Sequence, residues 1–335
     1  MKPVLVTGGA GYVGSHTCLR LAQAGFRPVV FDDLSNGHRE HVQWGPLELG
    51  DIRDGARLDA VFAAHRPVAV LHFAASIEVG ESVRNPGKFF DNNVGGSITL
   101  IEAARRAGVE AFVFSSTCAT FGDPVRLPMA EDHPQAPLNP YGRSKLMVEQ
   151  ALADYARLVG FRSTTLRYFN AAGADPEGRI GEWHEPETHA APLAIEVALG
   201  LRERFTIFGD DYDTRDGTAV RDYVHVLDLA DAHVLALRRL LDGGETGAFN
   251  LGTGHGTSVR ELIEGVKRAS GRPLPVAVAP RRPGDAPVLV ADNALARARL
   301  GWVPTRDLDA ILSSAWRWHA GRLRAGAGDL QNPSL

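Results

Sequence analysis

The sequence predicts an α/β protein with a doubly wound parallel sheet and a smaller C-terminal α/β domain that binds substrate. Apolar strand patterns and helical patterns alternate at regular spacing as far as about residue 170. The first strand, around 4–6, ends in three glycines spaced three apart, Gly8, Gly11 and Gly14, and a helical pattern begins at once. Strand, tight turn and helix in this order are typical of a Rossmann-like sheet, whose ligands lie at the carboxyl ends of its strands.

The glycine turn also predicts a dinucleotide site. Gly8 allows a turn that a Cβ would hinder, Gly11 lets the backbone approach a pyrophosphate, and Gly14 lets the helix pack against the strand. The free N–H groups and the positive end of the helix dipole would then face the phosphates. A second strand, 28–31, ends in Asp32, where an acidic side chain binds both ribose hydroxyls and repels a 2′-phosphate. The expected cofactor is NAD rather than NADP.

The later elements of the first domain continue the alternation of strand and helix patterns. Strands are expected at 68–75, 111–114 and 164–169, and helices at 86–107 and 141–159. The strand at 68–75 runs into small residues, which indicates backbone that passes close to a ligand. Asp51 precedes another helical stretch, and it fits equally as a helix N-cap or as a contact to an adenine ring.

The regular alternation of strand and helix patterns ends after residue 170. Residues 171–190 are rich in Gly, Pro, Asp and Glu and indicate a long functional loop. A helix at 226–241 and a strand at 248–251 are expected to return to the first domain. The predicted division is an NAD-binding domain at 1–170, joined by about 220–250, and a substrate domain at 171–335. The tail after about 321 is weakly patterned and is expected to be frayed.

Composition narrows the class of protein. The 335 residues are 44% apolar and 23% charged, and the net charge is −4. A chain with net negative charge is not expected to bind nucleic acid. Two cysteines, Cys18 and Cys118, fit a reducing compartment, although their pairing stays open. No signal sequence or membrane-spanning run is found. We expect a cytoplasmic protein with no membrane partner.

Two stretches are candidates for the chemistry. Tyr141 and Lys145 lie four apart and would share one face of a helix. An ammonium near a phenol favours the phenolate and lowers a pKa that starts near ~10, which would make Tyr141 a base. Thr117 follows a strand, where its hydroxyl can hydrogen-bond a reacting oxygen. Taken alone, a surface pair and a capping threonine explain these residues as well.

Together with the glycine turn, these residues resemble the nucleotide-sugar branch of the extended short-chain dehydrogenase/reductases. The closer resemblance is to the UDP-glucose 4-epimerase family, and it covers almost the whole chain. The matching stretches are 7–14, 80–83, 91–94, 141–149, 166–170, 220–226 and 281–285.

The resemblance implies a set of NAD contacts beyond the three glycines. They are Tyr12, Val13, Asp32, Asp33, Leu34, Ser35, Asn36, Gly37, Asp51, Ile52, Phe73, Ala74, Ala75, Asn93, Tyr141, Lys145 and Phe169. Ile77 stands where some members carry lysine, which weakens one cofactor contact.

The resemblance also implies the residues that bind a UDP-sugar substrate. They are Thr117, Tyr141, Asn170, His189, Ala190, Thr206, Ile207, Phe208, Arg221, Arg282, Asp285 and Leu289. Planar arginine cations suit a diphosphate in a chain of net negative charge. Arg221 beside Asp222 also fits a surface ion pair, and Arg281 with Arg282 fits a solvated run.

The implied reaction interconverts UDP-galactose and UDP-glucose through a 4-keto sugar, with bound NAD and no metal. Tyr141 would be the base and acid, with Thr117 as its hydroxyl partner. Cys118 and Ala119 stand where dehydratases of this branch carry an acidic pair, which disfavours dehydration. His72 and His225 are expected to be structural. A homodimer joined by the helices at 86–107 and 141–159 is implied as well.

Several alternatives remain open at this stage. Leu289 occupies the position at which some members exclude N-acetylated sugars, and its intermediate size leaves UDP-N-acetylhexosamines as substrates. Epimerases of UDP-xylose and UDP-arabinose share most of the motifs. A net oxidoreductase that releases NADH and a non-catalytic NAD-sensing regulator are the remaining alternatives from other classes.

Overall fold

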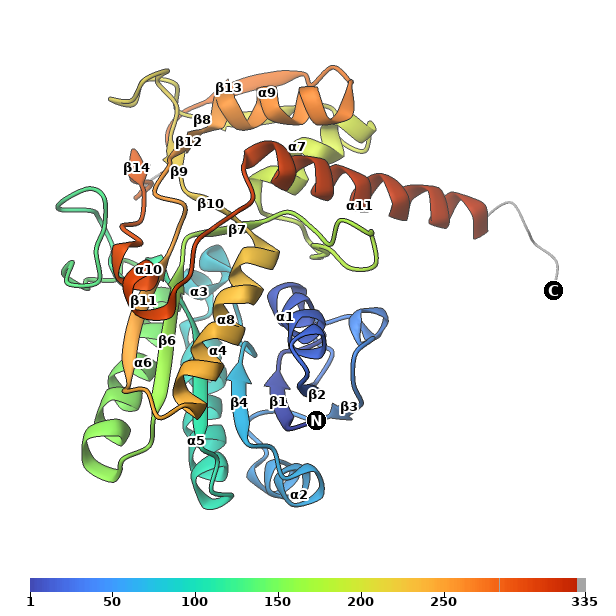
Figure 1. The fold of residues 1–335 in the computed structure, drawn as a ribbon. Coiled ribbons are helices and arrows are strands. Elements are labelled where there is room, and N and C mark those ends of the chain that lie inside the picture. The colour runs from blue at the N-terminus through green and yellow to red at the C-terminus, as the bar shows by residue number, and fades with distance from the viewer. Residues whose placement is uncertain (283, 330–335) are drawn as a thin grey trace.

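The computed structural model describes residues 1–282 and 284–329, and its centre is a seven-stranded parallel sheet (Figure 1). The strand order is β11-β6-β5-β4-β1-β2-β3. The chain adds strands on one side of β1 and then on the other, as in a doubly wound sheet. The strands are β1 (Pro3–Thr7), β2 (Arg27–Asp32), β3 (Leu47–Leu49), β4 (Ala69–His72), β5 (Ala111–Thr117), β6 (Ser163–Tyr168) and β11 (Gly247–Leu251).

Side chains alternate between two cores because successive residues of a strand point to opposite faces of the sheet. Val4 and Val6 lie in one core and Leu5 in the other. The first core is covered by α1 (Tyr12–Gln23), α8 (Val226–Leu241) and α10 (Ala294–Leu300). The second is covered by α2 (Gly55–His65), α5 (Ser97–Arg106) and α6 (Pro140–Val159). Helices on both faces confirm the predicted α/β architecture.

The helix predicted at 86–107 is divided into three parts. These are the short helix α4 (Pro86–Phe89), a π-helical segment, η2 (Phe90–Gly96), and α5, and a further short helix, α3 (Val79–Arg84), lies just before them. Apolar periodicity does not reveal the wider turn, because the segment continues the same helical axis. Two 3-10 turns, η1 (Arg39–His41) and η3 (Cys118–Thr120), complete the short elements of this half.

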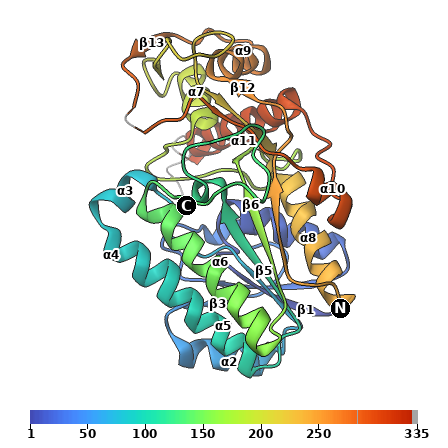
Figure 2. The same cartoon turned by 90° about the vertical axis from the view of Figure 1, so that its left-hand side faces the viewer.

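A smaller α/β lobe lies beyond the carboxyl ends of the strands (Figures 1 and 2). Its core is formed by α7 (Ala190–Leu199), α9 (Val259–Ser270), α11 (Leu308–Asp329) and β8 (Phe205–Phe208), and β13 (Val276–Ala279) pairs with β8 at the surface. Two further small sheets connect the halves. One pairs β7 (Asn170–Ala172) with β10 (Tyr223–His225), and the other joins β12 (Thr257–Ser258), β9 (Val220–Arg221) and β14 (Val288–Leu289).

The chain returns to the large sheet after its first visit to the lobe. Strand β11 pairs with β6 in parallel, and α8 packs beside α1, as the pattern at 226–251 predicts. Trp302 also lies in the core of the sheet, so the segment after α9 crosses back a second time.

The structure tests two predictions, the frayed C-terminal tail and the pairing of the two cysteines. Helix α11 continues to Asp329, so the prediction of a frayed tail after 321 is wrong for 322–329, and 330–335 lie outside the described residues. Cys18 and Cys118 are free thiols. Among the described residues, none of the helices has the length and apolarity needed to cross a membrane.

Candidate active site

The glycine turn joins β1 to the N-terminus of α1 and leaves no room for a side chain at Gly8 or Gly14. Gly8 has a φ of +70°, and a Cβ on it would lie 2.5 Å from the backbone nitrogen of Ala74. A Cβ on Gly14 would lie 2.2 Å from the carbonyl oxygen of Gly8, so the helix packs directly on the turn. At Gly11 the only neighbour within 4 Å is Gly8 O, at 3.3 Å, so the chain itself crowds Gly11 least. The open space at Gly11 fits the close approach of a pyrophosphate.

Asp32 ends β2 beside this turn, and its carboxylate is buried. Oδ2 accepts a hydrogen bond from Ala10 N and Oδ1 accepts one from Leu34 N, each at 2.9 Å. Burial raises the pKa of Asp32, and the two N–H donors oppose that rise. Each oxygen keeps a lone pair for a ribose hydroxyl, so the carboxylate can both fix the turn and bind a nucleotide.

The loop after Asp32 is tightly held. Leu34 has a positive φ of 60°, and Asp33 Oδ1 accepts hydrogen bonds from Ser35 N at 2.9 Å and Ser35 Oγ at 2.6 Å. A Cβ on Gly37 would lie 2.8 Å from Asp32 Oδ1. These contacts place the predicted loop 32–37 against the glycine turn.

Asp51 does not cap a helix. Asp54 is the N-cap of α2, while Asp51 forms an exposed ion pair with Arg53, which lowers the pKa of Asp51. The N-cap alternative is therefore wrong, and the adenine contact stays a prediction. Ile52 beside it is buried in the core of the sheet.

Asn93 lies in the π-helical segment and holds the loop that follows β4. Its Oδ1 accepts from Ser76 N at 2.8 Å, and its Nδ2 donates to Ser76 O and to Ser144 Oγ, each at 3.0 Å. The loop begins at Phe73 and Ala74, whose N–H groups both donate to Thr7 O. Through these bonds Asn93 connects the end of β4 to α6.

Thr117 and Tyr141 come together at the carboxyl end of β5. Thr117 is the last residue of β5, and its Oγ1 accepts from Ala119 N at 3.1 Å. Tyr141 lies in the first turn of α6, which is capped by Asn139 through Gly142 N at 2.9 Å. A Cβ on Gly142 would lie 2.4 Å from Ala119 O, so only glycine lets α6 approach the end of β5 this closely.

The electrostatics of Tyr141 differ from the prediction. Burial raises the pKa of Tyr141 to about 12, and a hydrogen bond with the Thr117 side chain opposes the rise. Lys145 Nζ donates to Ser115 O at 2.9 Å and lies 4.9 Å from the centroid of the Phe114 ring. Burial lowers the pKa of Lys145 to about 7. The expected lowering of the phenol pKa is therefore absent here, because the loss of solvent around Tyr141 outweighs its polar neighbours.

Predicted substrate residues from distant parts of the chain meet in the lobe. Arg221 Nη2 donates to Asp285 Oδ1 at 2.6 Å, and Arg221 pairs with Leu289 in the register of β9 and β14. Arg282 lies over the ring of Phe208 at 3.9 Å, and Phe208 ends β8, which also carries Thr206 and Ile207. The surface ion pair of Arg221 with Asp222 is not formed.

The other implied contacts lie at the edges of this region. His189 is the N-cap residue of α7, Ala190 begins that helix, and Asn170 N donates to Asp222 O at 3.0 Å. Phe169 belongs to a small apolar cluster against which Leu289 packs. Tyr12 OH donates to Gly173 O at 2.6 Å, which joins α1 to the loop of the lobe.

Sequence reasoning missed a buried ion pair below the candidate site. Glu149, one helical turn from Lys145, accepts from Arg167 Nη2 at 2.6 Å and also from Ser116 Oγ. Both charged side chains are almost fully buried. A Tyr-x-x-x-Lys-x-x-x-Glu spacing was the available signal, since it places all three side chains on one face of a helix. His72 and His225 are buried and take part in hydrogen bonds with Ser97 and Leu227 respectively, and their structural role stays a prediction.

Fold and site together define an NAD-dependent enzyme of the short-chain dehydrogenase type, and comparison with known proteins gives the same class. Residues 4–252 match the model of the NAD dependent epimerase/dehydratase family. The chain belongs to this family.

Its relatives within that family carry a more particular name. The chain is 64% identical to UDP-glucose 4-epimerase of Rhizobium meliloti (strain 1021), with 96% of this chain and 98% of the relative covered. Among solved structures it is similar to UDP-glucose 4-epimerase from Brucella ovis in complex with NAD, at 52% identity and a TM-score of 0.93, covering 94% and 98%. The epimerase from Bifidobacterium longum in complex with NAD⁺ and UDP matches at 37% identity and a TM-score of 0.90, covering 96% and 99%.

Proposed function

We propose that this protein is a UDP-glucose 4-epimerase that interconverts UDP-galactose and UDP-glucose and keeps its NAD bound throughout. The observation that carries the proposal is the meeting of Tyr141 and Thr117 at the carboxyl end of β5, with Lys145 hydrogen-bonded to Ser115 O of the same strand. The dinucleotide turn lies two strands away in the same sheet, at the same edge.

The residues around the glycine turn fit NAD. Gly11 leaves space for the pyrophosphate at the N-terminus of α1, and Asp32 offers carboxylate lone pairs to the adenosine ribose. When bound, NAD accepts a hydride from the sugar and returns it, and in its oxidised form adds a positive charge near the phenol. The buried carboxylate of Asp32 repels a 2′-phosphate, which favours NAD over NADP.

Tyr141 is the proposed base and acid. It takes the proton of the sugar 4-hydroxyl as the 4-keto sugar forms, and it gives that proton back after the sugar has presented its other face. The Thr117 hydroxyl donates a hydrogen bond to the same oxygen. Lys145, with a pKa near neutrality and held by Ser115, is the cation that orients and supports this pair.

The lobe is the proposed anchor for UDP. Arg221 and Arg282 supply the cations for the diphosphate, and the N-terminus of α7 adds N–H donors. A tightly held nucleotide with a loosely held sugar lets the keto sugar turn over while the nucleotide stays in place.

Leu289 supports a second candidate substrate class. Its side chain is only half-buried and packs against the apolar cluster that contains Phe169, and a residue of intermediate size at this position would leave room for a larger or different sugar. UDP-N-acetylhexosamines, UDP-xylose and UDP-arabinose are therefore alternative substrates.

The test uses purified protein and UDP-galactose without added NAD, followed by NMR for UDP-glucose. Parallel reactions contain UDP-N-acetylgalactosamine or UDP-arabinose, and Tyr141→Phe is the control, which we expect to lose at least about 10²-fold in turnover. Conversion that disappears in the variant supports the epimerase, and the fastest reaction identifies the sugar. No conversion even with NAD supplied would exclude the proposal and favour the NAD-sensing regulator. Stoichiometric NADH release would favour net oxidation.

Three further properties belong to the proposal. The large sheet with α8 and β11 would form the NAD domain, and the lobe would form the UDP-sugar domain. We propose a cytoplasmic homodimer formed through η2, α5 and α6, supported by the exposure of Met147 on α6, at 42%. Light scattering after gel filtration tests the dimer.

A further inference from the structure

A cluster of two histidines and two glutamates lies in the loop between β7 and α7, outside the proposed catalytic residues, and it shares His189 with the set expected to bind UDP. Glu182, His184, Glu187 and His189 each contribute one potential ligand atom, and these four atoms all lie within 4.8 Å of one another. All four come from eight consecutive residues, so one loop conformation is enough to build the cluster. The loop runs from Gly173 to His189 beside the N-terminus of α1, where Tyr12 OH holds it by Gly173 O.

Three separations in the cluster are close to those of a tetrahedral metal site, and in the fourth pair His189 Nδ1 is hydrogen-bonded directly to Glu182 Oε1, so a bound ion would have to replace that hydrogen bond. His184 Nδ1 lies 3.4 Å from Glu182 Oε1 and 3.8 Å from Glu187 Oε1, and His189 Nδ1 lies 3.8 Å from Glu187 Oε1. Four ligands at the usual zinc distances of about 2.0–2.2 Å stand about 3.3–3.6 Å apart at the corners of a tetrahedron. Small rotations of the side chains would bring the four atoms onto such corners.

Burial gives the second, independent observation. The Glu182 and Glu187 side chains are both only 4% exposed, and buried carboxylates require a compensating positive charge. His184 Nδ1 is also buried, and it lies 3.4 Å from Glu182 Oε1 without the geometry of a hydrogen bond. The N–H groups of Thr188 and His189 both donate to Glu187 Oε1 at 2.8 Å, which orients that carboxylate. His189, with 48% of its side chain exposed, leaves a path from solvent.

We propose that Glu182, His184, Glu187 and His189 form a structural site for a divalent transition metal of the zinc class. Two neutral imidazoles and two carboxylates balance one divalent cation, and mixed nitrogen and oxygen ligands in a closed tetrahedron suit Zn²⁺ better than Mg²⁺. The site goes beyond the epimerase reaction, which needs no metal, and it takes no part in the proton or hydride transfer.

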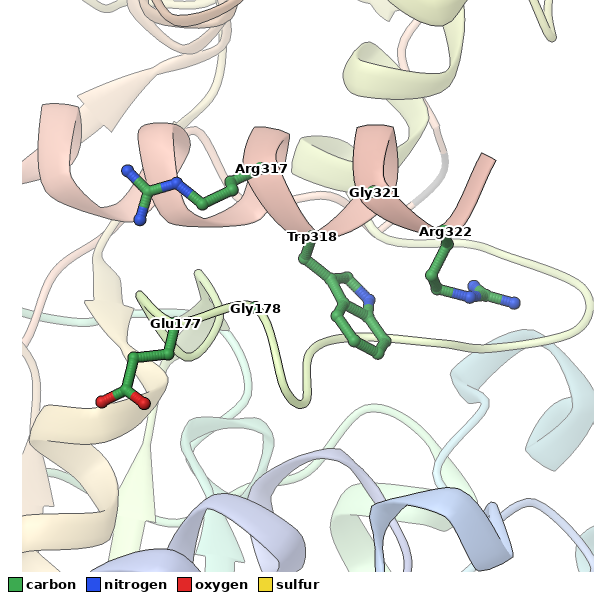
Figure 3. A pocket seen from close by; sticks show the side chains of 6 residues that line it. All are labelled: Glu177, Gly178, Arg317, Trp318, Gly321 and Arg322. Atoms are coloured by element: carbon green, nitrogen blue, oxygen red, sulfur yellow. The ribbon is translucent and has the colours of Figure 1, made fainter. Parts of the chain in front are cut away.

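The site would fix the loop that joins the two halves of the molecule. Trp318 of α11 donates through Nε1 to Glu182 O at 2.9 Å, and His38 of the large domain contacts Trp183 O through Nε2 at 3.1 Å. Figure 3 shows Trp318 and Arg322 pointing from α11 toward this loop. Metal binding would therefore hold the loop between the cofactor side and the lobe.

The alternative is a cluster of ion pairs with no metal. The two glutamates raise the pKa of His184 to about 10, against the effect of burial, so protonated histidines also balance the carboxylates. This alternative predicts no specific uptake of metal, and a direct binding measurement separates the two.

The experiment titrates Zn²⁺ into tag-free, chelator-treated full-length protein by calorimetry, without UDP-sugar. We expect one Zn²⁺ per chain and no signal from Mg²⁺. Glu187→Gln should weaken zinc binding at least about tenfold, because a neutral amide is a poor zinc ligand. The matched control is Glu185→Gln, the same substitution two residues away on an exposed side chain, and it should bind as the wild type does.

Crystals of the wild type soaked in Zn²⁺ keep the test decisive if Glu187→Gln fails to fold, since anomalous scattering at the zinc edge locates the ion. No zinc binding by the wild type, equal binding by both variants, or an anomalous peak elsewhere would overturn the proposal. Binding is measured without turnover, so a failure here leaves the epimerase proposal intact, and a failure of the epimerase assay leaves this one intact.

Discussion

At Thr117, substitutions can remove the hydroxyl group while keeping the size of the side chain, so the role of the hydroxyl can be tested by itself. Thr117→Val keeps the size of the side chain and removes the hydrogen bond to Tyr141, whereas Thr117→Ser keeps the hydroxyl. We expect Thr117→Val to lower kcat about 10²-fold, the usual effect of losing one donor at a developing oxyanion. Thr117→Ser should stay within about tenfold of the wild type.

The same pair of variants predicts a change in pH dependence. Because the Thr117 hydrogen bond opposes the rise in the pKa of Tyr141, its loss should raise that pKa further. The reaction needs the phenolate, so the rising limb of the kcat profile should move to higher pH in Thr117→Val and stay in place in Thr117→Ser. An unmoved profile in both variants would show that another group titrates.

Arg221 gives a second prediction at this scale, on binding rather than chemistry. Arg221→Lys keeps the charge but loses the planar guanidinium that contacts Asp285 and the carbonyl of Ala286. KM for UDP-galactose should rise about tenfold while kcat changes little, as steady-state kinetics would measure. A fall in kcat at constant KM would place Arg221 near the reacting sugar instead.

The partner of Arg221 illustrates where sequence reasoning ends. Arg221 and Asp222 are neighbours in the chain, but extended backbone points successive side chains to opposite sides. Asp222 therefore turns inward and accepts from Thr253 N and Gly254 N, while Arg221 reaches Asp285, 64 residues away. The family resemblance implied Arg221 and Asp285 as substrate residues, yet their pairing depends on how the lobe folds. The raised pKa of Tyr141 could not be predicted from the sequence for a similar reason, because the burial of the phenol depends on the whole fold.

At the scale of elements, the approach of α6 to the end of β5 depends on Gly142. Gly142→Ala would place its Cβ 2.4 Å from Ala119 O, so the first turn of α6 must move and carry Tyr141 away from Thr117. We expect kcat to fall at least about tenfold, since misplaced catalytic groups are costly, while bound NAD stays close to stoichiometric.

The matched control is Gly321→Ala in α11, where a Cβ would meet nothing within 4 Å. This variant should keep full activity and gain slightly in stability, because alanine favours helices over glycine. Absorbance of released cofactor and progress curves measure both quantities. Normal kcat in Gly142→Ala would contradict the proposed role of this contact.

Most elements of the large sheet were predictable because their strands are apolar, regularly spaced and ended by glycine or polar turns. The helix at 226–241 matches α8 in its limits, and the strand at 248–251 matches β11 within one residue. The π-helical segment was not predictable, because Asn93 takes its position from hydrogen bonds to Ser76, and that loop is distant in sequence. The family resemblance implied that Asn93 contacts the cofactor, but it did not indicate the π-helical turn that orients the Asn93 side chain.

For the whole molecule, buried histidines predict sensitivity to acid. Burial lowers the pKa of each of five histidines from 6.5 to about 3 or 4, and these are His16, His41, His72, His225 and His233. The unfolded chain binds protons first as the pH falls, so stability is full above about 6.5 and is lost from there toward pH 3. Between pH 7.5 and 5.5 these five histidines should together lower the free energy of unfolding by roughly 7 kcal/mol.

Urea unfolding at several pH values measures this loss. His233→Gln removes one titrating group, so the slope of stability against pH should flatten by about one fifth. His255→Gln, on an exposed side chain, should leave the slope unchanged. Equal stability at pH 7.5 and 5.5 would contradict the prediction.

Trp183 lies between two partners from opposite ends of the chain. The His38 ring stacks on it at 3.6 Å with an interplanar angle of 6°, and the Arg322 guanidinium lies 3.6 Å from the same ring, necessarily on the other face. An indole enclosed in this way has its own emission spectrum, distinct from that of a solvated indole. The molecule thus carries a built-in optical probe, whose fluorescence would change whenever the loop separates from either the large domain or α11.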